Sequence, residues 1–197
     1  MNIYFINIEK IINKIGNDTL RQMYGNYHHH FSRIILKRIL EENYNITSSI
    51  SEDNGRPYIK DSKLDFSISH SKNIIAIGFN DKDGAKIGLD IEFIKPREYS
   101  KVLKYYGINK SDITKEEFFQ IWTQYEAEFK RCGGDFSKLK TRNIFSLKYN
   151  GYMAAISTDK NVQPILYEVM LNDLDDNIKT KNLEKFYYLT PSEIRLK

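Results

Sequence analysis

Two periodicities alternate along this chain, and their order limits its possible folds more than any other feature. Between Tyr27 and Tyr44, apolar residues recur at helical spacing with basic residues between them. Helical patterns also cover residues 98 to 106 and 115 to 131, and Cys132-Gly133-Gly134 supplies a stop for the second of these helices. Strand composition occupies residues 2 to 8, 64 to 68, 74 to 79, 87 to 93, 143 to 149, 151 to 157 and 163 to 170, with a hairpin turn at Asn150-Gly151. The pattern predicts an α+β protein of two α/β subdomains, residues 1–95 and 96–197, with a ligand cleft between them.

Composition removes several classes of protein. The 197 residues are 41% hydrophobic and 28% charged, which excludes collagen-like, coiled-coil and disordered chains. A net charge of +4, spread evenly, does not indicate a dedicated nucleic-acid binder. The longest apolar run, at residues 74 to 79, is too short for a membrane span, and residues 1–8 lack the features of a signal peptide. Cys132 is the only cysteine, so we expect a reduced cytoplasmic protein with no membrane or nucleic-acid partner.

The segment Gly88-Leu89-Asp90-Ile91-Glu92 holds the first candidate site. On a strand, Leu89, Ile91 and Phe93 share one face, while Asp90 and Glu92 project together from the other. Paired carboxylates raise each other's pKa unless a cation lies between them, and Mg²⁺ favours one or two carboxylates of this kind. The acidic outer face of a half-exposed strand would show the same pattern.

A second candidate lies on the helix at residues 115 to 131. Glu126, one turn after Trp122, falls inside the aromatic arc of the helical wheel, and Lys130 lies at the edge of that arc. Glu128 lies near the other boundary, where it could reach solvent. A buried carboxylate has to be paired or bind a metal, so Glu126 is the stronger candidate. The alternative is a plain Glu–Lys pair beside a core helix.

Two polar segments earlier in the chain complete the set. Asp65-Phe66-Ser67-Ile68-Ser69-His70-Ser71 is a strand ending in hydroxyls and an imidazole, which suit phosphate oxygens. Asn54-Gly55-Arg56-Pro57 places a guanidinium on a stiff turn, suited to bidentate phosphate binding. A turn capped by its own serines and an ordinary surface arginine are the alternatives.

Taken together, the blocks resemble the Sfp-type 4′-phosphopantetheinyl transferases. The resemblance runs from about residue 55 to 130 through Gly55-Arg56-Pro57, Phe66-Ser67-Ile68-Ser69-His70-Ser71, Gly88-Leu89-Asp90-Ile91-Glu92 and Trp122-x-x-x-Glu126-Ala127-x-x-Lys130. It implies two α/β subdomains related by a pseudo-twofold axis, with coenzyme A between them. The implied activity is transfer of the 4′-phosphopantetheine arm of coenzyme A to a serine of an apo acyl or peptidyl carrier protein, releasing adenosine 3′,5′-bisphosphate. A monomer is expected.

The resemblance also implies roles for individual residues. Asp90, Glu92 and Glu126 would bind Mg²⁺, and Lys130 would stabilise the pyrophosphate. Glu126 is in addition the candidate acceptor of the serine proton. Ser69 and His70 match the coenzyme-binding turn of the family, and Arg56 stands where the family has a basic contact to the 3′-phosphate.

Two departures from the family pattern concern phosphate contacts. Tyr125 stands where a lysine usually precedes the helix glutamate. In the first long helix, the expected basic residue is replaced by a histidine run in which His28 is the nearest counterpart, with Arg33 further on. Adjacent helical residues diverge by about 100°, so His28, His29 and His30 cannot chelate one ion together.

Two other functions are compatible with the same residues. A binding module of this fold could recognise coenzyme A or carrier proteins without turnover, and a metal-dependent phosphodiesterase could use the same carboxylates. The identity of the carrier and the number of metal ions stay open.

Overall fold

The structure is a computed structural model of the 197-residue chain. It describes residues 1–53, 55–105, 107–108, 113–135, 137, 143–160, 162–170, 179–182 and 188–189. Helices and strands alternate as the sequence predicts, and the mixed α+β class is confirmed. Among the described residues, no helix is both long enough and apolar enough to cross a bilayer.

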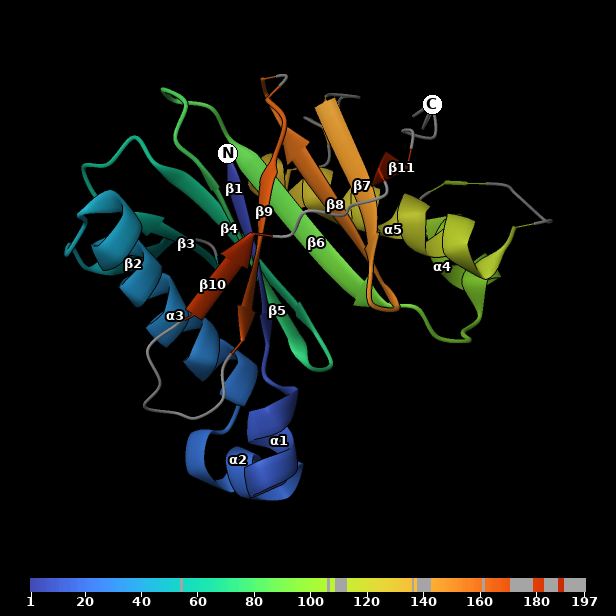
Figure 1. Cartoon of the computed structure of the whole chain (residues 1–197). Coiled ribbons are helices and arrows are strands. Elements are labelled where there is room, and N and C mark those ends of the chain that lie inside the picture. The colour runs from blue at the N-terminus through green and yellow to red at the C-terminus, as the bar shows by residue number, and fades with distance from the viewer. Residues whose placement is uncertain are drawn as a thin grey trace.

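The first sheet has five strands in the order β10-β9-β1-β5-β4. Their bounds are β1 Asn2–Asn7, β4 Asp65–Ser71, β5 Ile74–Asn80, β9 Ile165–Met170 and β10 Lys179–Asn182. β1 pairs antiparallel with β5 and parallel with β9. The long helix α3, Tyr27–Tyr44, covers one face of this sheet and buries Phe31, Ile35 and Ile39 against it (Figure 1).

The second sheet has four strands in the order β11-β7-β8-β6. These are β6 Ile87–Phe93, β7 Asn143–Tyr149, β8 Tyr152–Thr158 and β11 Tyr188–Leu189. The predicted hairpin joins β7 to β8, and both turn residues have positive φ, 46° at Asn150 and 82° at Gly151, as a two-residue turn of this kind requires. Ile3 and Phe5 of the first sheet pack against Leu89, Ile91 and other apolar side chains of the second, so the core lies between the two sheets.

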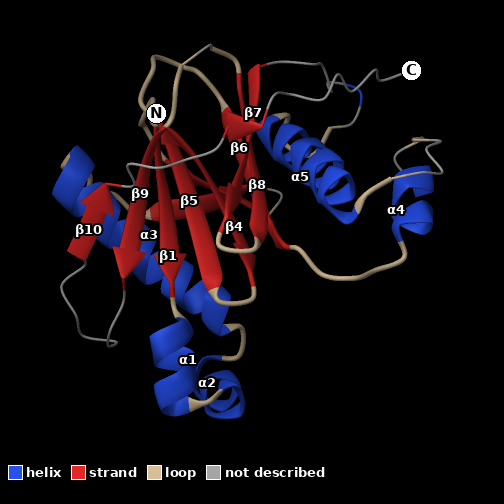
Figure 2. Cartoon of the chain, turned by 45° about the vertical axis from the view of Figure 1, so that its right-hand side comes forward, coloured by secondary structure: helices blue, strands red, loops and turns tan. Residues whose placement is uncertain are grey.

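Helices close the second sheet on its outer side. α5, Lys115–Arg131, lies over β6 and β8, and α4, Tyr99–Tyr105, packs beside α5 (Figure 2). α5 begins at a capping box in which Thr114 and Glu117 hydrogen-bond each other's backbone N–H groups. It ends at Cys132, followed by Gly133 and Gly134 with φ of 68° and 84°, which confirms the predicted stop.

Smaller elements lie outside the predicted set. Two short helices, α1 Glu9–Ile15 and α2 Asn17–Tyr24, follow β1. β2 Ile50–Asp53 and β3 Arg56–Ile59 form a two-stranded ribbon around the predicted turn. Seven or eight residues contain two helical turns, which is too few for periodicity to distinguish α1 and α2 from a loop.

Strand pairing does not follow the predicted boundary at residue 95. β6 precedes that boundary and pairs with β8, whereas β9 follows it and pairs with β1. Each sheet therefore contains strands from both halves of the chain. The division into units 1–95 and 96–197 stays a prediction.

Candidate functional site

The two faces of β6 differ as its alternation predicts. Leu89 and Ile91 lie in the core between the sheets, with Phe93 packed at its edge. Asp90 and Glu92 project from the other face, toward α5; Asp90 is buried, with 5% exposed, and Glu92 is half-buried. Two neighbouring carboxylates are thus enclosed between a strand and a helix.

α5 approaches β6 closely because Gly88 has no side chain. A Cβ at Gly88 would lie 1.8 Å from the Ala127 carbonyl oxygen and 2.6 Å from the Arg131 nitrogen. This approach brings Lys130 over the strand, where Nζ donates to Asp90 Oδ1 at 2.7 Å and to the Leu89 carbonyl at 3.1 Å. The predicted partners Asp90 and Lys130 therefore form an ion pair.

β4 and β6 are joined by side chains in place of a backbone ladder. Four alternate residues of β4 accept the backbone N–H groups of four alternate residues of β6. The pairs are Asp65 with Ile87 at 2.8 Å, Ser67 with Leu89 at 3.0 Å, Ser69 with Ile91 at 3.3 Å and Ser71 with Phe93 at 3.0 Å. We call this set the serine ladder. Because a one-residue slip would break all four bonds, it fixes the register of the two edge strands.

The serine ladder also orients the carboxylates. Ser69 Oγ donates to Asp90 Oδ1 at 2.8 Å, and Ser71 Oγ donates to Glu92 Oε2 at 3.1 Å. A serine hydroxyl has one proton, so these two protons are already used. The family resemblance implies a coenzyme contact for Ser69 and no individual role for Ser67 or Ser71. The sequence signal for the serine ladder is a hydroxyl at every second position of the strand, on the face opposite the apolar Phe66 and Ile68.

The negative charge of Asp90 and Glu92 is only partly neutralised by the protein. Asp90 Oδ2 is buried and has no hydrogen-bond partner in the described part of the chain. Burial raises the pKa of Asp90, against the opposing effect of Lys130, and the nearby Glu126 raises it further. Burial and the charge of Asp90 likewise raise the pKa of Glu92. Such a pair favours a bound cation or a proton.

The predicted metal trio is not gathered into a ready-made centre. Within the described residues, no group of three His, Cys, Asp or Glu side chains has the arrangement of a metal site. Nevertheless, a hard cation prefers carboxylate oxygens, and the unpartnered Asp90 Oδ2 beside Glu92 offers such oxygens. These residues fit a Mg²⁺ ion in chemistry, and the assignment stays a prediction.

The helical wheel was wrong about the two glutamates. Glu126 is half-buried, whereas Glu128 is 4% exposed and pairs with Arg131 at 2.6 Å and with Ser157. The wheel took the aromatic side of α5 as its only buried face, and Phe118 and Phe119 are indeed buried. The side that packs on β6 and β8 instead carries Ala127 and short or polar side chains, because only these allow the close approach at Gly88. Glu128 lies on that side and is neutralised there.

His28 and His70, far apart in the sequence, stack face to face with ring centroids 4.6 Å apart. His28 Nε2 bonds the Lys72 carbonyl, so this nitrogen carries the proton of the neutral ring. Burial lowers the pKa of His28, and burial with the charges of His28 and Lys130 lowers the pKa of the His70 ring to about 4, although one side of that ring is exposed. Both rings are therefore neutral near pH 7.

Arg56 lines a cavity of about 260 Å³ between β4 and the end of α5. The cavity walls include Pro57, Phe66, Ser67, Phe129 and Lys130. It lies beside the Asp90–Lys130 pair, between parts of both predicted units. The guanidinium of Arg56 itself bonds Asp65 Oδ2 at 2.8 Å and backbone carbonyls of β6 and α5.

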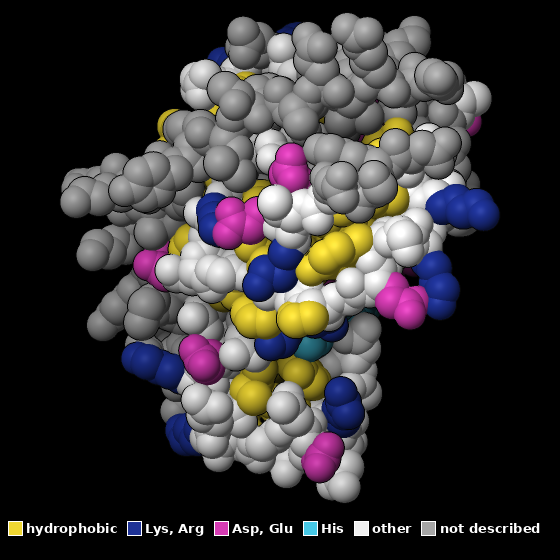
Figure 3. Space-filling view, turned by 90° about the vertical axis from the view of Figure 1, so that its right-hand side faces the viewer, with side chains coloured by type: hydrophobic (Ala, Val, Ile, Leu, Met, Phe, Trp, Pro, Cys, Tyr) yellow, Lys and Arg dark blue, Asp and Glu magenta, His cyan; other side chains and the backbone are white. Residues whose placement is uncertain are grey.

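Two further cations rest on aromatic rings near Glu92. Arg97 Cζ lies 4.2 Å from the Trp122 ring centroid, and Lys72 Nζ lies 3.3 Å from that of Phe93. Arg97 also lowers the pKa of Glu92. Tyr125, by contrast, is buried, with 7% exposed. A space-filling view of the α4–α5 side shows basic side chains beside a recessed histidine (Figure 3).

No family model matches the chain. Among curated proteins it is similar to one from Haemophilus influenzae described as "Putative 4'-phosphopantetheinyl transferase", at 24% identity over 144 residues. The match covers 66% of this chain and 60% of the relative, so the chain spans less than two thirds of that protein's length. This similarity supports a distant relationship to 4′-phosphopantetheinyl transferases and does not distinguish a subfamily.

Proposed function

We propose that the protein transfers the 4′-phosphopantetheine arm of coenzyme A to a serine of an apo acyl or peptidyl carrier protein. The observation that carries the proposal is the buried carboxylate of Asp90, bound by Lys130 at one oxygen and, among the described residues, without a partner at the other. Such a pair can hold a cation and a phosphate side by side. The similarity to the Haemophilus influenzae protein supports the same chemistry. We propose in addition that the protein is of the Sfp type, with two subdomains related by a pseudo-twofold axis.

Asp90 Oδ2 and the Glu92 carboxylate, with Glu126 from α5, are the groups that would hold Mg²⁺. When bound, Mg²⁺ would polarise the diphosphate of coenzyme A and offset the charge that develops on the leaving phosphate. Ser69 and Ser71 would keep both β6 carboxylates in place through their hydroxyl protons.

Lys130 would bind the diphosphate directly. An ammonium group has three N–H bonds, and two of them donate to Asp90 and Leu89. Within the part of the chain that the structure describes, the third meets no acceptor, so it is available for a phosphate oxygen. The Glu126 carboxylate would accept the proton of the attacking serine as the serine oxygen bonds to the phosphorus that carries the pantetheine arm. The phosphoanhydride P–O bond breaks in the same step, and adenosine 3′,5′-bisphosphate leaves with its electron pair.

Part of the coenzyme would occupy the cavity beside Lys130. At about 260 Å³ the cavity is below the volume range of sites that enclose a whole drug-sized ligand, so most of the coenzyme would lie along the surface. The exposed edge of His70 would face that surface, with His28 supporting the ring by stacking. A carrier with an acidic surface suits the small positive charge of this chain, and raised salt would weaken their association.

Intact mass spectrometry tests the transfer. The full chain is incubated with coenzyme A, Mg²⁺ and apo acyl or peptidyl carrier proteins, and each carrier is weighed. A gain of one phosphopantetheine arm, lost on chelation of Mg²⁺ and in Glu126→Gln, is expected. Glu116→Gln is the matched control, since Glu116 lies on the same helix and pairs with Lys148 at the surface. Absence of any gain across unrelated carriers would rule the proposal out.

A binding module without turnover is the second candidate. Two observations favour it: the trio is not assembled into a metal centre within the described residues, and a buried tyrosine stands at position 125. Calorimetric binding of coenzyme A without a mass gain on any carrier would support this function. Release of free phosphopantetheine with no carrier present would instead indicate a phosphodiesterase.

A further inference from the structure

The guanidinium of Arg56 has no terminal N–H left for a ligand. Nη1 donates to the Lys130 carbonyl and, at 3.3 Å, to the Arg131 carbonyl. Nη2 donates to Asp65 Oδ2 at 2.8 Å and to the Ile87 carbonyl at 3.1 Å. Each terminal nitrogen carries two N–H bonds, so all four have acceptors inside the protein. A bidentate grip on a phosphate needs at least one terminal N–H, so it would have to break at least one of these bonds.

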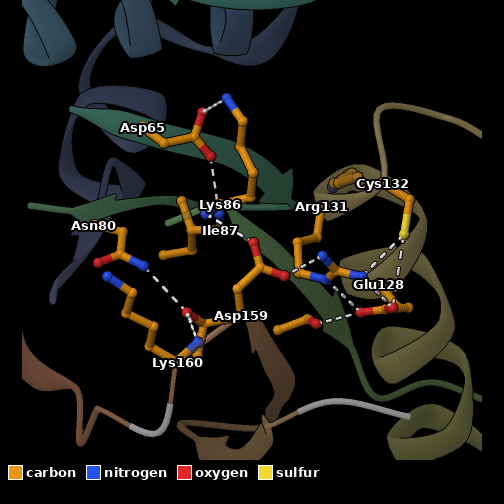
Figure 4. A network of polar contacts seen from close by, with 12 residues as sticks. Asp65, Asn80, Lys86, Ile87, Glu128, Arg131, Cys132, Asp159 and Lys160 are labelled. Atoms are coloured by element: carbon orange, nitrogen blue, oxygen red, sulfur yellow. Dashed lines mark hydrogen bonds and ion pairs between the residues drawn. The ribbon is translucent and has the colours of Figure 1, made fainter. Parts of the chain in front are cut away.

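Arg56 is also paired with a carboxylate. Its partner Asp65 is buried, with 9% exposed, and is itself held by the Ile87 N–H at 2.8 Å and by Lys86 Nζ at 3.3 Å. Figure 4 shows Asp65 with Lys86 and Ile87 on one side of the end of α5. A guanidinium that is paired with a carboxylate and has used its four terminal N–H bonds attracts a phosphate less than a free one does.

These bonds act on the last turn of α5. The final carbonyls of a helix have no partner within it, and a cation at this end interacts favourably with the helix dipole. Arg56 donates to the carbonyl of Lys130 and places a positive charge at this end of the helix, and the side chain of Lys130 reaches Asp90. In the same turn, the side chain of Arg131 pairs with Glu128 and Asp159 (Figure 4). The last turn of α5 is therefore held through the carbonyls that Arg56 binds and through the side chain of Arg131.

We propose that Arg56, held by Asp65, is a positioning residue that sets Lys130 against Asp90, and that it does not contact a phosphate of the coenzyme. Its catalytic consequence rests on the proposed transferase function. Its structural consequence, the order of the last turn of α5, does not.

Kinetics with two donor substrates separates the two roles. Arg56→Gln is compared with wild type using coenzyme A and 3′-dephospho-coenzyme A. A positioning role predicts that kcat falls about 10- to 100-fold for both donors, with their kcat/KM ratio unchanged within about twofold. A selective loss with coenzyme A, which brings the two donors to equal kcat/KM, would overturn the proposal. Lys37→Gln, which breaks an exposed ion pair with Glu41, is the control.

Hydrogen exchange gives a readout that needs no activity. In Arg56→Gln the amides of Cys132, Gly133 and Gly134, which bond carbonyls of the last turn, should exchange faster, and those of α3 should not. Arg56→Lys keeps the charge but cannot make four directed bonds, so the same amides should exchange faster than in wild type even if Arg56→Gln does not fold. Unchanged exchange in both variants would overturn the positioning role, whereas a wild type without transfer would overturn only the proposed function.

Discussion

Asp90 is a buried carboxylate whose second oxygen is unpartnered within the described chain. The surrounding protein disfavours its charged form, since burial raises its pKa against the effect of Lys130. Buried ionisable groups with shifted pKa values occur at functional sites more often than elsewhere, because the shift destabilises the fold and is kept where the reaction needs it.

Asp90→Asn should therefore separate activity from stability. We expect transfer to fall about 100-fold or more, because the amide cannot bind a cation as a carboxylate does. The free energy of unfolding in the absence of divalent cations should not fall, since the amide removes a buried charge and Lys130, with 32% of its side chain exposed, can turn to solvent. Urea denaturation with a chelator measures this. A large loss of stability would mean that the ion pair holds the fold together.

His70 should make stability depend on acidity. Its pKa falls from 6.5 to about 4 through burial and the nearby charges of His28 and Lys130, so the folded state favours the neutral ring. The contribution of the neutral His70 ring to the free energy of unfolding is complete above pH 6.5. It is lost as the pH falls from 6.5 toward 4, because the unfolded chain binds the proton more readily. Because the ring is partly exposed, solvent screening reduces the effect.

In His70→Gln the urea midpoint should consequently drop less on acidification than in wild type. His30→Gln is the control, since His30 stacks on Tyr24 instead of on His28. Equal pH profiles for wild type and His70→Gln would contradict the lowered pKa.

At the scale of elements, the contact of α5 with β6 depends on one missing side chain. In Gly88→Ala the new Cβ would meet backbone atoms of α5, which cannot turn away. We expect a loss of about 3 kcal/mol or more in unfolding free energy, and lower activity as Lys130 moves from Asp90. Gly78→Ala is the matched control on β5, because its new Cβ would meet only side-chain ends of Ile3, Ile87 and Leu89 that can shift. Equal losses in the two variants would contradict the close approach.

The serine ladder provides a second test at this scale. Ser67→Ala removes the acceptor of the buried Leu89 N–H, and an unsatisfied buried donor costs about 1–3 kcal/mol. Ser62→Ala removes an acceptor in a turn, where water can replace it, and should cost less. Chemical denaturation of both variants measures the difference. A neutral Ser67→Ala would show that β4 and β6 are held by other contacts.

At the scale of the whole molecule, strands from both halves complete each sheet. A fragment of residues 1–95 would lose β9 from the side of β1 and β8 from the side of β6. We expect neither 1–95 nor 96–197 to unfold cooperatively alone, and a mixture to regain cooperativity. Thermal melts followed by circular dichroism test this. A cooperative transition in the isolated 1–95 fragment would show that the predicted boundary separates independent units.

Local pattern alone predicted much of this molecule. β6 and α5 have the predicted bounds, and the Asn150-Gly151 turn joins the predicted strands. The alternation of β6 also placed Asp90 and Glu92 on one face, because side-chain direction on a strand depends only on neighbouring residues.

Other properties were decided by contacts between distant segments. The pairing of β6 with β8 and of β1 with β9, the burial of Glu128 against Ser157, and the bonds of Arg56 to backbone carbonyls of β6 and α5 each join parts of the chain far apart in sequence. A helical wheel shows which side chains share a face, but not which face the sheet will cover. Gly88 determines which face is covered. Because this strand position has no side chain, α5 can approach β6 closely through Ala127, and Lys130 then reaches Asp90.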